Sequence, residues 1–526
     1  MSNYIKIESV ELENVNRPNS FILYQSKSLL DLDFSNPEFE RYGGRGLNSH
    51  GGGARAANYG HYQVKGVGLT PLAGVIEGVN YNHGTVPLEE ALLEAIYSEV
   101  LANVLPVGVA DFYGVIYTGQ NTAFEFNEDR KESLVATHGA LIVREKAIRP
   151  AHFMRTNNFK IQEKYQAEVI SDVHRIRNVI HALADSFDSH DQFIEYVGEF
   201  LQGCAEQFGF AHIAGITHGA MTPSNILMDG RWIDLVTPSF IDRGRNYRVA
   251  NLTFYHESSI AIEVSQELCD TYSKFTGISF DTSILHDYFK SSLALSIDYH
   301  LPYVLGLDRE IATSIDNDSK VAPLYHRLKS LFKQESKVYF THHLDDEHSV
   351  NLCGDIINVV DTVLYTKESA EAHLYRYCYL HYKHKDTINF RGFVAVCLIK
   401  ALKRDLLAKL YYRTKVESCL QKLSEKAIPS QIKFFVESYK ASSLWVFDDT
   451  FLDSEILYQS TDKACSLVFD ADKMIVNTTR NKNTHFTALV GNIADLPCDF
   501  FRANSLIFGE YFDNIDKLLR KLSNEQ

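Results

Sequence analysis

The sequence has few of the features that mark a specialised class of protein. No stretch approaches the roughly 18 consecutive apolar residues that a membrane-spanning helix needs, and the apolar run Gly392–Leu398 ends far short of it. The first residues, Met-Ser-Asn-Tyr-Ile-Lys-Ile-Glu, have neither the basic nor the apolar region of a secretory signal. The 8 cysteines form no C-x-x-C pair, which predicts reduced thiols in a cytoplasmic protein.

An excess of positive charge is also absent. Lys and Arg together number 52 against 67 Asp and Glu, a formal net charge of −15. This balance argues against a protein that coats nucleic acid, because neutralising phosphates needs an excess of Lys and Arg. A local basic pocket for a nucleotide is still compatible with it. The 526 residues, 45% of them hydrophobic, exclude a disordered chain and are enough for several folding units.

The hydrophobic pattern predicts an α+β fold. Strands are expected at His61–Gly66, 107–118 and 139–144, and helices at 87–103 and 190–208. In the second helix, Ser189 and Gln192 have the spacing of a capping box and Gly209 is the expected C-cap. Further on, 255–430 is expected to be mostly helical, 440–500 rich in strands, and 503–522 a helix.

These elements suggest three regions along the chain. A β-rich region containing the glycine-rich stretch 42–60 would occupy residues 1–158, and a helical region residues 159–435. A C-terminal extension would occupy residues 436–526.

The most informative segment lies between residues 218 and 234. Asp229-Gly230 separates two short apolar runs, a pattern that predicts a hairpin with a two-residue type I′ turn. In that register Asn225 faces Asp234, with Cβ atoms about 4.5–5.5 Å apart. Oxygen ligands at this spacing suit Mg²⁺ held together with substrate phosphates. The alternative is an ordinary hairpin with polar ends.

The flanking residues favour the metal-binding interpretation. The segment from His218 to Asn225 has the spacing of the protein-kinase loop H-R-D-x-x-x-x-N, and Asp234 lies where the kinase D-F-G aspartate would lie. Upstream, a strand lysine, Lys65, and a helix glutamate, Glu94, follow the glycine-rich stretch in the kinase order.

This order of motifs resembles the selenoprotein-O family, kinase-like proteins that transfer AMP from ATP to protein hydroxyls. The resemblance covers roughly residues 40–260. The matching pieces, besides His218-Gly-Ala-Met, are Gly52-Gly-Ala-Arg-Ala56, Val64-Lys-Gly-Val-Gly-Leu-Thr-Pro71, Leu93-Glu-Ala-Ile-Tyr-Ser-Glu99, Leu141-Ile-Val-Arg144 and Asp234-Leu-Val-Thr-Pro238.

The resemblance implies a two-lobed protein-kinase-like core and a set of site residues. Lys65 would bind phosphates of ATP, with Glu94 holding it in place, and Asn225 and Asp234 would hold Mg²⁺. These four residues form the implied catalytic set. Arg144 and Arg155 match the arginines that bind the outward phosphates of a flipped ATP, and Arg55 of the glycine-rich match completes the nucleotide-binding set. Surface salt bridges are the alternative for the arginines.

Two departures from the family bear on the chemistry. Ala220 occupies the position of the kinase base, and Ser224 replaces the family aspartate directly before the metal-binding asparagine. A hydroxyl acceptor must lose a proton, whereas a carboxylate is already ionised at neutral pH. The sequence therefore favours either ATP-dependent AMP or phosphoryl transfer to a carboxylate of a protein or peptide, or a pseudokinase scaffold without turnover.

The length and the degenerate kinase-like core also resemble the large subunits of siderophore-microcin maturation systems. That resemblance implies a cytoplasmic complex with a small acyltransferase-like partner and a peptide substrate. A second group of metal-capable residues, His342-His-Leu-Asp-Asp-Glu-His348, lacks the H-E-x-x-H pattern, so we expect a solvated loop and no zinc site there.

Overall fold

The fold was analysed in a computed structural model of the chain. It describes residues 4–6, 12, 14–44, 50–75, 83–126, 134–156, 159–240, 247–249, 252–253, 256–315, 318–333, 338–339, 352–366, 368–424, 429–448, 450, 453–463, 466–478, 500 and 503–523. Helices make up 52% and strands 16% of the structure, and its main sheet is antiparallel, so the predicted mixed class is confirmed.

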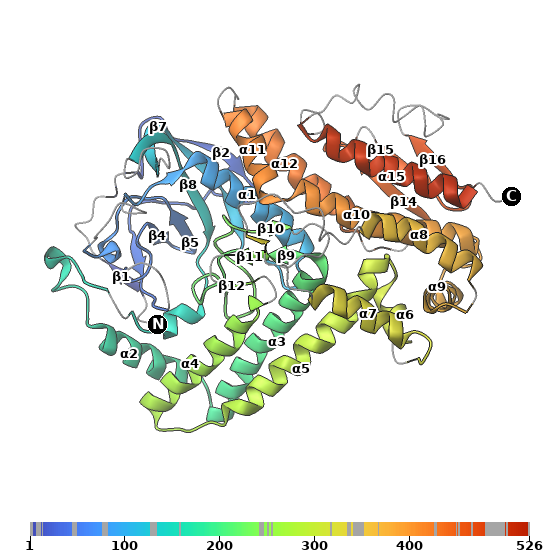
Figure 1. The fold of residues 1–526 in the computed structure, drawn as a ribbon. Coiled ribbons are helices and arrows are strands. Elements are labelled where there is room, and N and C mark those ends of the chain that lie inside the picture. The colour runs from blue at the N-terminus through green and yellow to red at the C-terminus, as the bar shows by residue number, and fades with distance from the viewer. Residues whose placement is uncertain are drawn as a thin grey trace.

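The N-terminal part forms a large antiparallel sheet (Figure 1). Seven strands follow one another across it in the order β1-β3-β4-β5-β8-β7-β2, and β6 pairs with β8 beside this path. A strand lies in each of the predicted ranges 61–66, 107–118 and 139–144, although the second strand begins at Phe112 and continues to Phe126. The strands are β1 (Tyr4–Lys6), β2 (Phe21–Gln25), β3 (Glu38–Glu40), β4 (Ala56–Tyr59), β5 (Tyr62–Lys65), β6 (Val86–Pro87), β7 (Phe112–Phe126) and β8 (Leu134–Glu145).

Both faces of the central strand β8 are buried. Ala140 and Ile142 belong to the main core, whereas Leu141 and Val143 belong to a second apolar cluster on the other face. This alternation follows from the two-residue period of a strand. Helix α1 (Leu88–Val104) packs against β7 and β8, which confirms the helix predicted at 87–103.

Most of the chain after β8 is helical, as predicted for 255–430. The first group comprises η2 (Pro150–Phe153), η3 (Glu163–Tyr165), α2 (Asp172–Ala184), α3 (His190–Ala214), α4 (Ser259–Thr276), α5 (Thr282–His300), η6 (Leu301–Leu305), α6 (Arg309–Thr313) and α7 (Ala322–Lys333). The second comprises α8 (Leu352–Tyr365), α9 (Ala370–His381), α10 (Phe390–Leu410), α11 (Arg413–Ser424) and α12 (Pro429–Val446). A one-turn helix, η1 (Pro71–Ala73), precedes them all.

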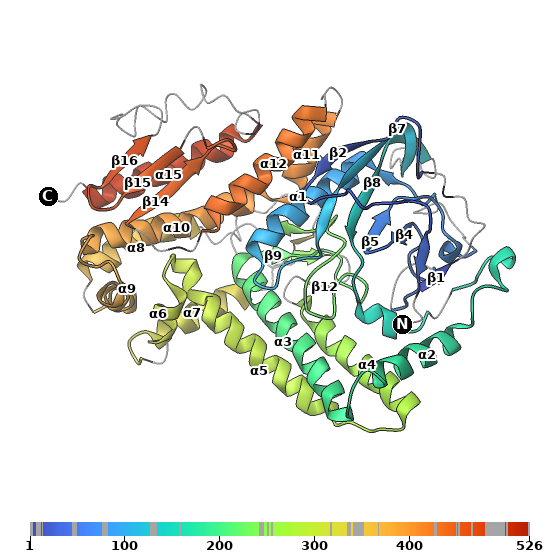
Figure 2. The ribbon, with the colours of Figure 1, turned by 180° about the vertical axis from the view of Figure 1, so that it is seen from behind.

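Smaller sheets complete the fold. The short strands are β9 (Ile216–Thr217), β10 (Ser239–Phe240), β11 (Tyr247–Val249), β12 (Leu252–Thr253) and β13 (Val338–Tyr339). At the C-terminal end, β14 (Ser454–Gln459), β15 (Ser466–Asp470) and β16 (Ile475–Thr478) form an antiparallel sheet, and α15 (Ser505–Ser523) confirms the predicted last helix. Figures 1 and 2 show this sheet and α15 on the opposite side of the molecule from β1, β4 and β5.

The predicted regional boundaries meet these elements differently. The boundary at 158 lies beside residues outside the described part, and the boundary at 435 falls within the continuous helix α12. The division into three regions stays a prediction. Residues 45–49 of the glycine-rich stretch also lie outside the described part.

The predicted start of the second helix at residue 190 is confirmed, but its predicted end at 208 and its capping box are wrong. Helix α3 continues through Gly209 to Ala214, and Gly215 at φ +71° forms its C-cap. The Ser189 side chain makes no cap hydrogen bond, and Gln192 accepts from the backbone N–H of Asp188 rather than from that of Ser189. A Cβ at Gly209 would overlap Ser296 of α5, so this glycine permits close helix packing and does not end the helix.

The predicted hairpin exists, but its register is wrong by one residue. Ile226 pairs with Trp232, and the N–H of Leu227 bonds the carbonyl of Arg231 at 2.8 Å. The loop therefore has three residues, with Gly230 at φ +88°, rather than the two of a type I′ turn. As a result Asn225 lies opposite Ile233, whose N–H bonds its carbonyl at 3.1 Å, and not opposite Asp234.

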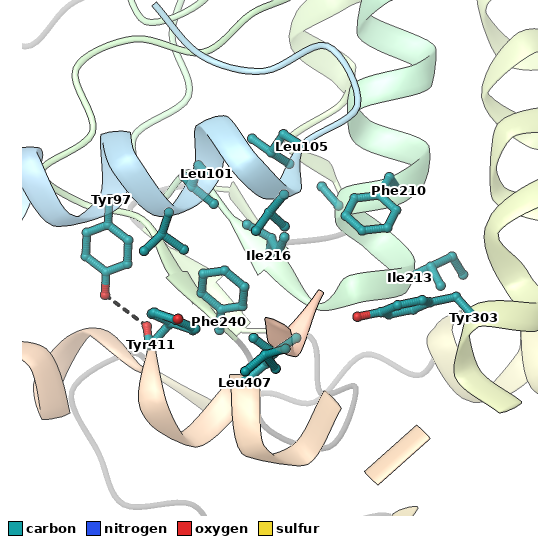
Figure 3. Close-up of a cluster of buried hydrophobic side chains, with 14 of the residues drawn as sticks. Tyr97, Leu101, Leu105, Phe210, Ile213, Ile216, Phe240, Tyr303, Leu407 and Tyr411 are labelled. Carbon is teal, nitrogen blue, oxygen red and sulfur yellow. Dashed lines mark hydrogen bonds between the residues drawn. The ribbon is translucent and has the colours of Figure 1, made fainter. Parts of the chain in front are cut away.

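Residues far along the chain pack against helix α1. Figure 3 shows Tyr97 and Leu101 of α1 in an apolar cluster with Ile216, Phe240 and Tyr411. The Tyr97 hydroxyl donates to the carbonyl of Tyr411 at 2.9 Å. The C-terminal helices thus contribute directly to the position of the helix that carries Glu94.

Two glycines of α3 should respond oppositely to alanine. Alanine normally stabilises a helix interior by about 1 kcal/mol relative to glycine, and Gly198→Ala should show this gain because no atom of the described residues lies within 4 Å of the place that its Cβ would occupy. At Gly203 the Cβ would overlap the carbonyl of Asp229, so Gly203→Ala should lose about 1–3 kcal/mol. Urea unfolding measures both; equal gains would contradict this packing.

Candidate functional site

The register of the large sheet directs three polar side chains toward α1. Lys65 pairs with Ile142, and Gln63 pairs with Arg144, across strands β5 and β8. Directly opposed residues of an antiparallel pair project to the same face. Because Ile142 packs in the core that contains α1, Gln63, Lys65 and Arg144 lie on the α1 side of the sheet.

Helix α1 supplies two carboxylates to this face. Glu90 and Glu94 are four residues apart, so they lie one turn apart on the same side of the helix. Glu94 Oε2 accepts a hydrogen bond from Lys65 Nζ at 2.9 Å, and Glu90 Oε1 lies 3.3 Å from the same nitrogen. The predicted pairing of Lys65 with Glu94 is therefore present in the structure.

Asp234 enters from the end of the hairpin. Its φ of +66° is in the left-handed region, which is uncommon for a residue other than glycine and is concentrated at functional sites. Asp234 Oδ1 accepts from Lys65 Nζ and, at 3.4 Å, from Arg144 Nη1. Arg144 Nη1 also donates to Glu94 Oε1 at 2.6 Å.

Lys65, Glu94, Arg144 and Asp234 thus form a closed ion quartet in which each cation contacts both anions. The side chains of the first three are 2–6% exposed, whereas that of Asp234 is 31% exposed. Solvent, and any ligand, therefore reaches the quartet through Asp234.

The opposite charges of the quartet shift the pKa values of Asp234 and Lys65 toward the ionised forms. Burial by itself would raise the pKa of Asp234, but the Lys65 and Arg144 cations outweigh burial and hold this pKa well below its usual range. Conversely, burial by itself would lower the pKa of Lys65, and the Asp234 and Glu94 carboxylates raise it above its usual value. Asp234 and Lys65 are therefore both ionised at neutral pH.

Arg55 lies at the edge of this arrangement. Its Nη2 lies 2.7 Å from Glu90 Oε1, and the same carboxylate oxygen lies 3.3 Å from Lys65 Nζ. Burial opposes ionisation of Glu90, but Arg55 and then Lys65 lower its pKa.

Asn225 lies close to Asp234 in the sequence, but its side chain contacts residues of its own loop rather than the quartet. Its Nδ2 donates to the carbonyl of Ala220 at 2.7 Å, and its Oδ1 accepts from the hydroxyl of Ser224 at 3.3 Å. This fixes which end of the amide presents an oxygen. The structure brings Asn225 and Asp234 into one hairpin, but offset by one position rather than directly opposed.

Arg155 is not part of the quartet. Its side chain is half exposed, and Nε lies 3.6 Å from Asp172 of α2. Its backbone does border the glycine-rich segment, because the N–H of Gly44 bonds the Arg155 carbonyl at 3.2 Å. Of the seven predicted site residues, the structure therefore joins Lys65, Glu94, Arg144 and Asp234 directly and places Arg55, Asn225 and Arg155 around them.

The segment before Ala220 is held by two buried side chains. His218 Nε2 contacts the carbonyl of Ile233, the residue before Asp234, at 3.0 Å. Burial lowers the pKa of His218 to about 4, so Nε2–H of a neutral ring donates this bond. Glu257 accepts from the N–H groups of His218 and Gly219 at 3.0 and 2.9 Å, and burial raises its pKa to about 7.

Sequence reasoning did not find Glu90, Glu257, Gln63 and Arg149, although two of them carried a signal. Glu90 precedes Glu94 by one helical turn, and Gln63 precedes Lys65 by one strand repeat. Glu257 and Arg149 reach the site only through the tertiary fold. Arg149 Nη1 donates to the carbonyl of Ser224 at 2.9 Å, and Nη2 donates to Gln63 Oε1 at 2.7 Å.

The donor set was compared with the needs of a divalent cation. Among the described residues, no group of three or more His, Cys, Asp or Glu side chains forms a metal site. Asp234 and Asn225 supply two oxygen donors on one hairpin, which suits Mg²⁺ that keeps waters and substrate phosphates as its other ligands. Residues 342–348, expected to be a solvated loop, lie outside the described part.

The chain was compared with protein-family models and with curated proteins. No protein-family model matches the chain, and no curated protein matches it either. In the part of the chain that the structure describes, no helix has the length and apolar character needed to cross a membrane.

His218 should make stability depend on pH. Its ordinary pKa is 6.5 and its pKa in the fold is about 4, so the unfolded chain binds the extra proton as the pH falls. The stabilisation from neutral His218 is present above about pH 6.5 and is lost toward pH 4, by about 3 kcal/mol. Wild type should therefore lose more unfolding free energy than His218→Gln between pH 7 and pH 4.5.

Urea unfolding at the two pH values measures this difference. Glu257 bonds the backbone of residue 218 and not its ring, so it should titrate alike in both proteins. Parallel losses in wild type and His218→Gln would show that the ring is not held in its neutral form.

Proposed function

We propose that this chain uses ATP and Mg²⁺ to transfer AMP or a phosphoryl group to a carboxylate of a protein or peptide. The proposal includes a two-lobed protein-kinase-like arrangement, with the large sheet and α1 on one side of the nucleotide and the helical part on the other. In maturation of a siderophore-conjugated microcin peptide, a small acyltransferase-like partner would use the activated carboxylate. This biological setting rests on the resemblance described above.

The observation that carries the proposal is the ion quartet. A lysine of a central strand, a glutamate of the packed helix and an aspartate after a hairpin meet within hydrogen-bonding distance, although 169 residues separate Lys65 from Asp234. Burying ionised groups costs several kcal/mol each unless they are closely paired. An apolar cluster would hold these elements together at lower cost, so the charges favour a role in binding a charged ligand.

The residues suit the phosphates and metal of ATP. Lys65 and Arg144 are the cations nearest the opening at Asp234, and arginine can bind a phosphate in a bidentate manner. Asp234 and Asn225 would hold Mg²⁺, which supplies charge neutralisation for the phosphates when bound. Lys65 would then orient the phosphates, with Glu94 and Glu90 keeping its amine in place.

The acceptor is inferred from what the loop lacks. Ala220 has no proton-accepting group, and Asp234, Glu94 and Glu90 are each bound to a cation. A carboxylate acceptor needs no base, because one of its oxygens can attack phosphorus directly. Attack at the α-phosphorus forms an acyl-adenylate as the bond to the leaving pyrophosphate breaks; attack at the γ-phosphorus forms an acyl-phosphate and releases ADP.

A catalytically inactive pseudokinase scaffold is the second candidate, and the same Ala220 favours it. Such a protein would bind nucleotide, a partner subunit and a peptide without turnover. Transfer of label separates the two candidates, whereas nucleotide binding does not.

Binding is tested by thermal unfolding with ATP and Mg²⁺. Ligand at about 100 times its dissociation constant stabilises the folded state by about 2.7 kcal/mol, so the midpoint should rise by several degrees in wild type. Asp234→Asn should lose this rise because it weakens the metal site. Asp229→Asn is the matched control on the same hairpin, since its half-exposed side chain pairs with Arg231 outside the quartet.

Turnover is then followed with ATP labelled separately at the α- and γ-phosphate, using a candidate peptide and its partner protein. Label from the α position with pyrophosphate release would establish adenylylation, and label from the γ position a kinase. Binding without transfer would leave the scaffold. No midpoint rise in wild type would refute the nucleotide site itself.

The two arginines to which the resemblance assigns phosphate binding, Arg144 and Arg155, should differ. Arg144→Lys keeps the charge but loses the planar fork, and should weaken ATP binding about tenfold or more. Arg155→Lys should change it by less than about threefold, because exposed ion pairs such as Arg155 with Asp172 contribute little. Calorimetric titration with ATP and Mg²⁺ measures both. Equal losses would mean that Arg155 turns toward the phosphates when nucleotide binds.

A further inference from the structure

A second set of hydrogen bonds, through the uncharged amide of Gln63, joins the proposed phosphate-binding residue Arg144 to the loop that carries the proposed metal ligand Asn225. Gln63 Oε1 accepts from Arg144 Nε at 2.9 Å and from Arg149 Nη2 at 2.7 Å. Arg149 Nη1 continues to the carbonyl of Ser224 at 2.9 Å, directly before Asn225. The chain of contacts therefore runs from Arg144 through Gln63 and Arg149 to the Asn225 loop.

The Gln63 amide has one possible orientation. Its Nε2 donates to Glu40 Oε2, so the oxygen must face the two arginines. Glu40 is itself fixed, because its Oε1 lies 2.7 Å from His152 Nε2, and His152 Nδ1 accepts from the N–H of Arg149 at 2.9 Å. The neutral amide oxygen of Gln63 thus accepts from both guanidinium groups, and the Glu40 carboxylate lies 3.8 Å from Arg149 Nη2.

Burying these polar and charged side chains costs free energy, so the arrangement favours a functional role for them. Gln63 and Glu40 are 1% exposed and Arg149 is 2% exposed. The backbone already attaches the hairpin at this point, since the N–H of Ala151 bonds the Pro223 carbonyl at 3.1 Å and the N–H of Met228 bonds the Ile148 carbonyl at 3.0 Å. The Arg149 side chain is thus not needed to attach the hairpin.

We infer that Gln63 and Arg149 are positioning residues that couple Arg144 to the Asn225 loop, so that nucleotide and Mg²⁺ bind cooperatively. The inference rests on the proposed function. Gln63 sets the guanidinium plane of Arg144, and Arg149 sets the height of the loop on which Asn225 presents its oxygen. Neither residue touches the ligand in this scheme.

The test measures ATP affinity with and without Mg²⁺. In wild type, Mg²⁺ should strengthen ATP binding. In Arg149→Met the gain from Mg²⁺ should shrink about tenfold or more, because a hydrogen bond to a charged group is lost, while metal-free ATP affinity changes by less than about threefold. Gln63→Leu should weaken metal-free binding as well, because it also releases Arg144.

Arg149→Lys and Arg404→Met serve as controls. Lysine keeps the charge but lacks the planar fork that places one nitrogen at Gln63 and another at the Ser224 carbonyl, so it should not restore the Mg²⁺ gain. Arg404 is a second buried arginine that donates to a backbone carbonyl, that of Ile213 on the far end of α3. Its replacement by methionine should lower the melting temperature without changing the Mg²⁺ gain.

Hydrogen exchange gives a readout that needs no ligand. The amides of Asn225, Leu227 and Ile233 are hydrogen-bonded within the hairpin, and they should exchange faster in Arg149→Met than in wild type or Arg404→Met. Faster exchange in a protein that binds no ATP would refute the proposed function while the physical coupling stands. An unchanged Mg²⁺ gain in Arg149→Met, with normal ATP binding, would overturn the inference alone.

Discussion

The salt bridge between Lys65 and Glu94 is the interaction on which the rest of the site depends. It joins strand β5 of the large sheet to helix α1, and both side chains have almost no access to solvent. Burying either charge without a close partner would cost several kcal/mol, so the pair favours the alignment of β5 and α1 in which the two groups meet. Arg144 and Asp234 can complete the quartet only when this alignment exists.

The C-terminal half of the chain maintains that alignment. Lys440 of α12 lies 2.6 Å from Glu99 of α1, and the Tyr24 hydroxyl donates to the same carboxylate at 2.9 Å. One turn further on, Asn103 donates to the hydroxyl of Ser443 at 3.1 Å. These polar contacts of Glu99 and Asn103 supplement the apolar cluster of Figure 3, and Tyr411, Lys440 and Ser443, each more than three hundred positions from its partner, help to fix α1.

The loop that carries Asn225 has its own internal order. Glu257 binds the two N–H groups at its start, neutral His218 binds the carbonyl before Asp234, and Asn225 binds the carbonyl of Ala220. These bonds satisfy backbone groups that would otherwise be buried without partners. The loop has Ala220 where a kinase has its base. For this reason the proposed acceptor is a carboxylate, which is already ionised.

Local patterns predicted most of the elements, and strand and helix periods predicted those that carry Lys65 and Glu94 and the 139–144 strand. The 218–234 motif singled out Asp234, whereas Arg144 came from the family resemblance. The hairpin register, the length of α3 and the position of Arg155 outside the quartet emerged from the tertiary structure, because each depends on packing between segments far apart in the chain. Gly209 lies inside α3, where a side chain would overlap Ser296 of α5. Arg149 joins the site because it bonds both Gln63 of β5 and the Ser224 carbonyl before the hairpin. The contacts of Arg149 leave no periodic trace in the sequence, and for that reason this positioning residue emerged only from the fold.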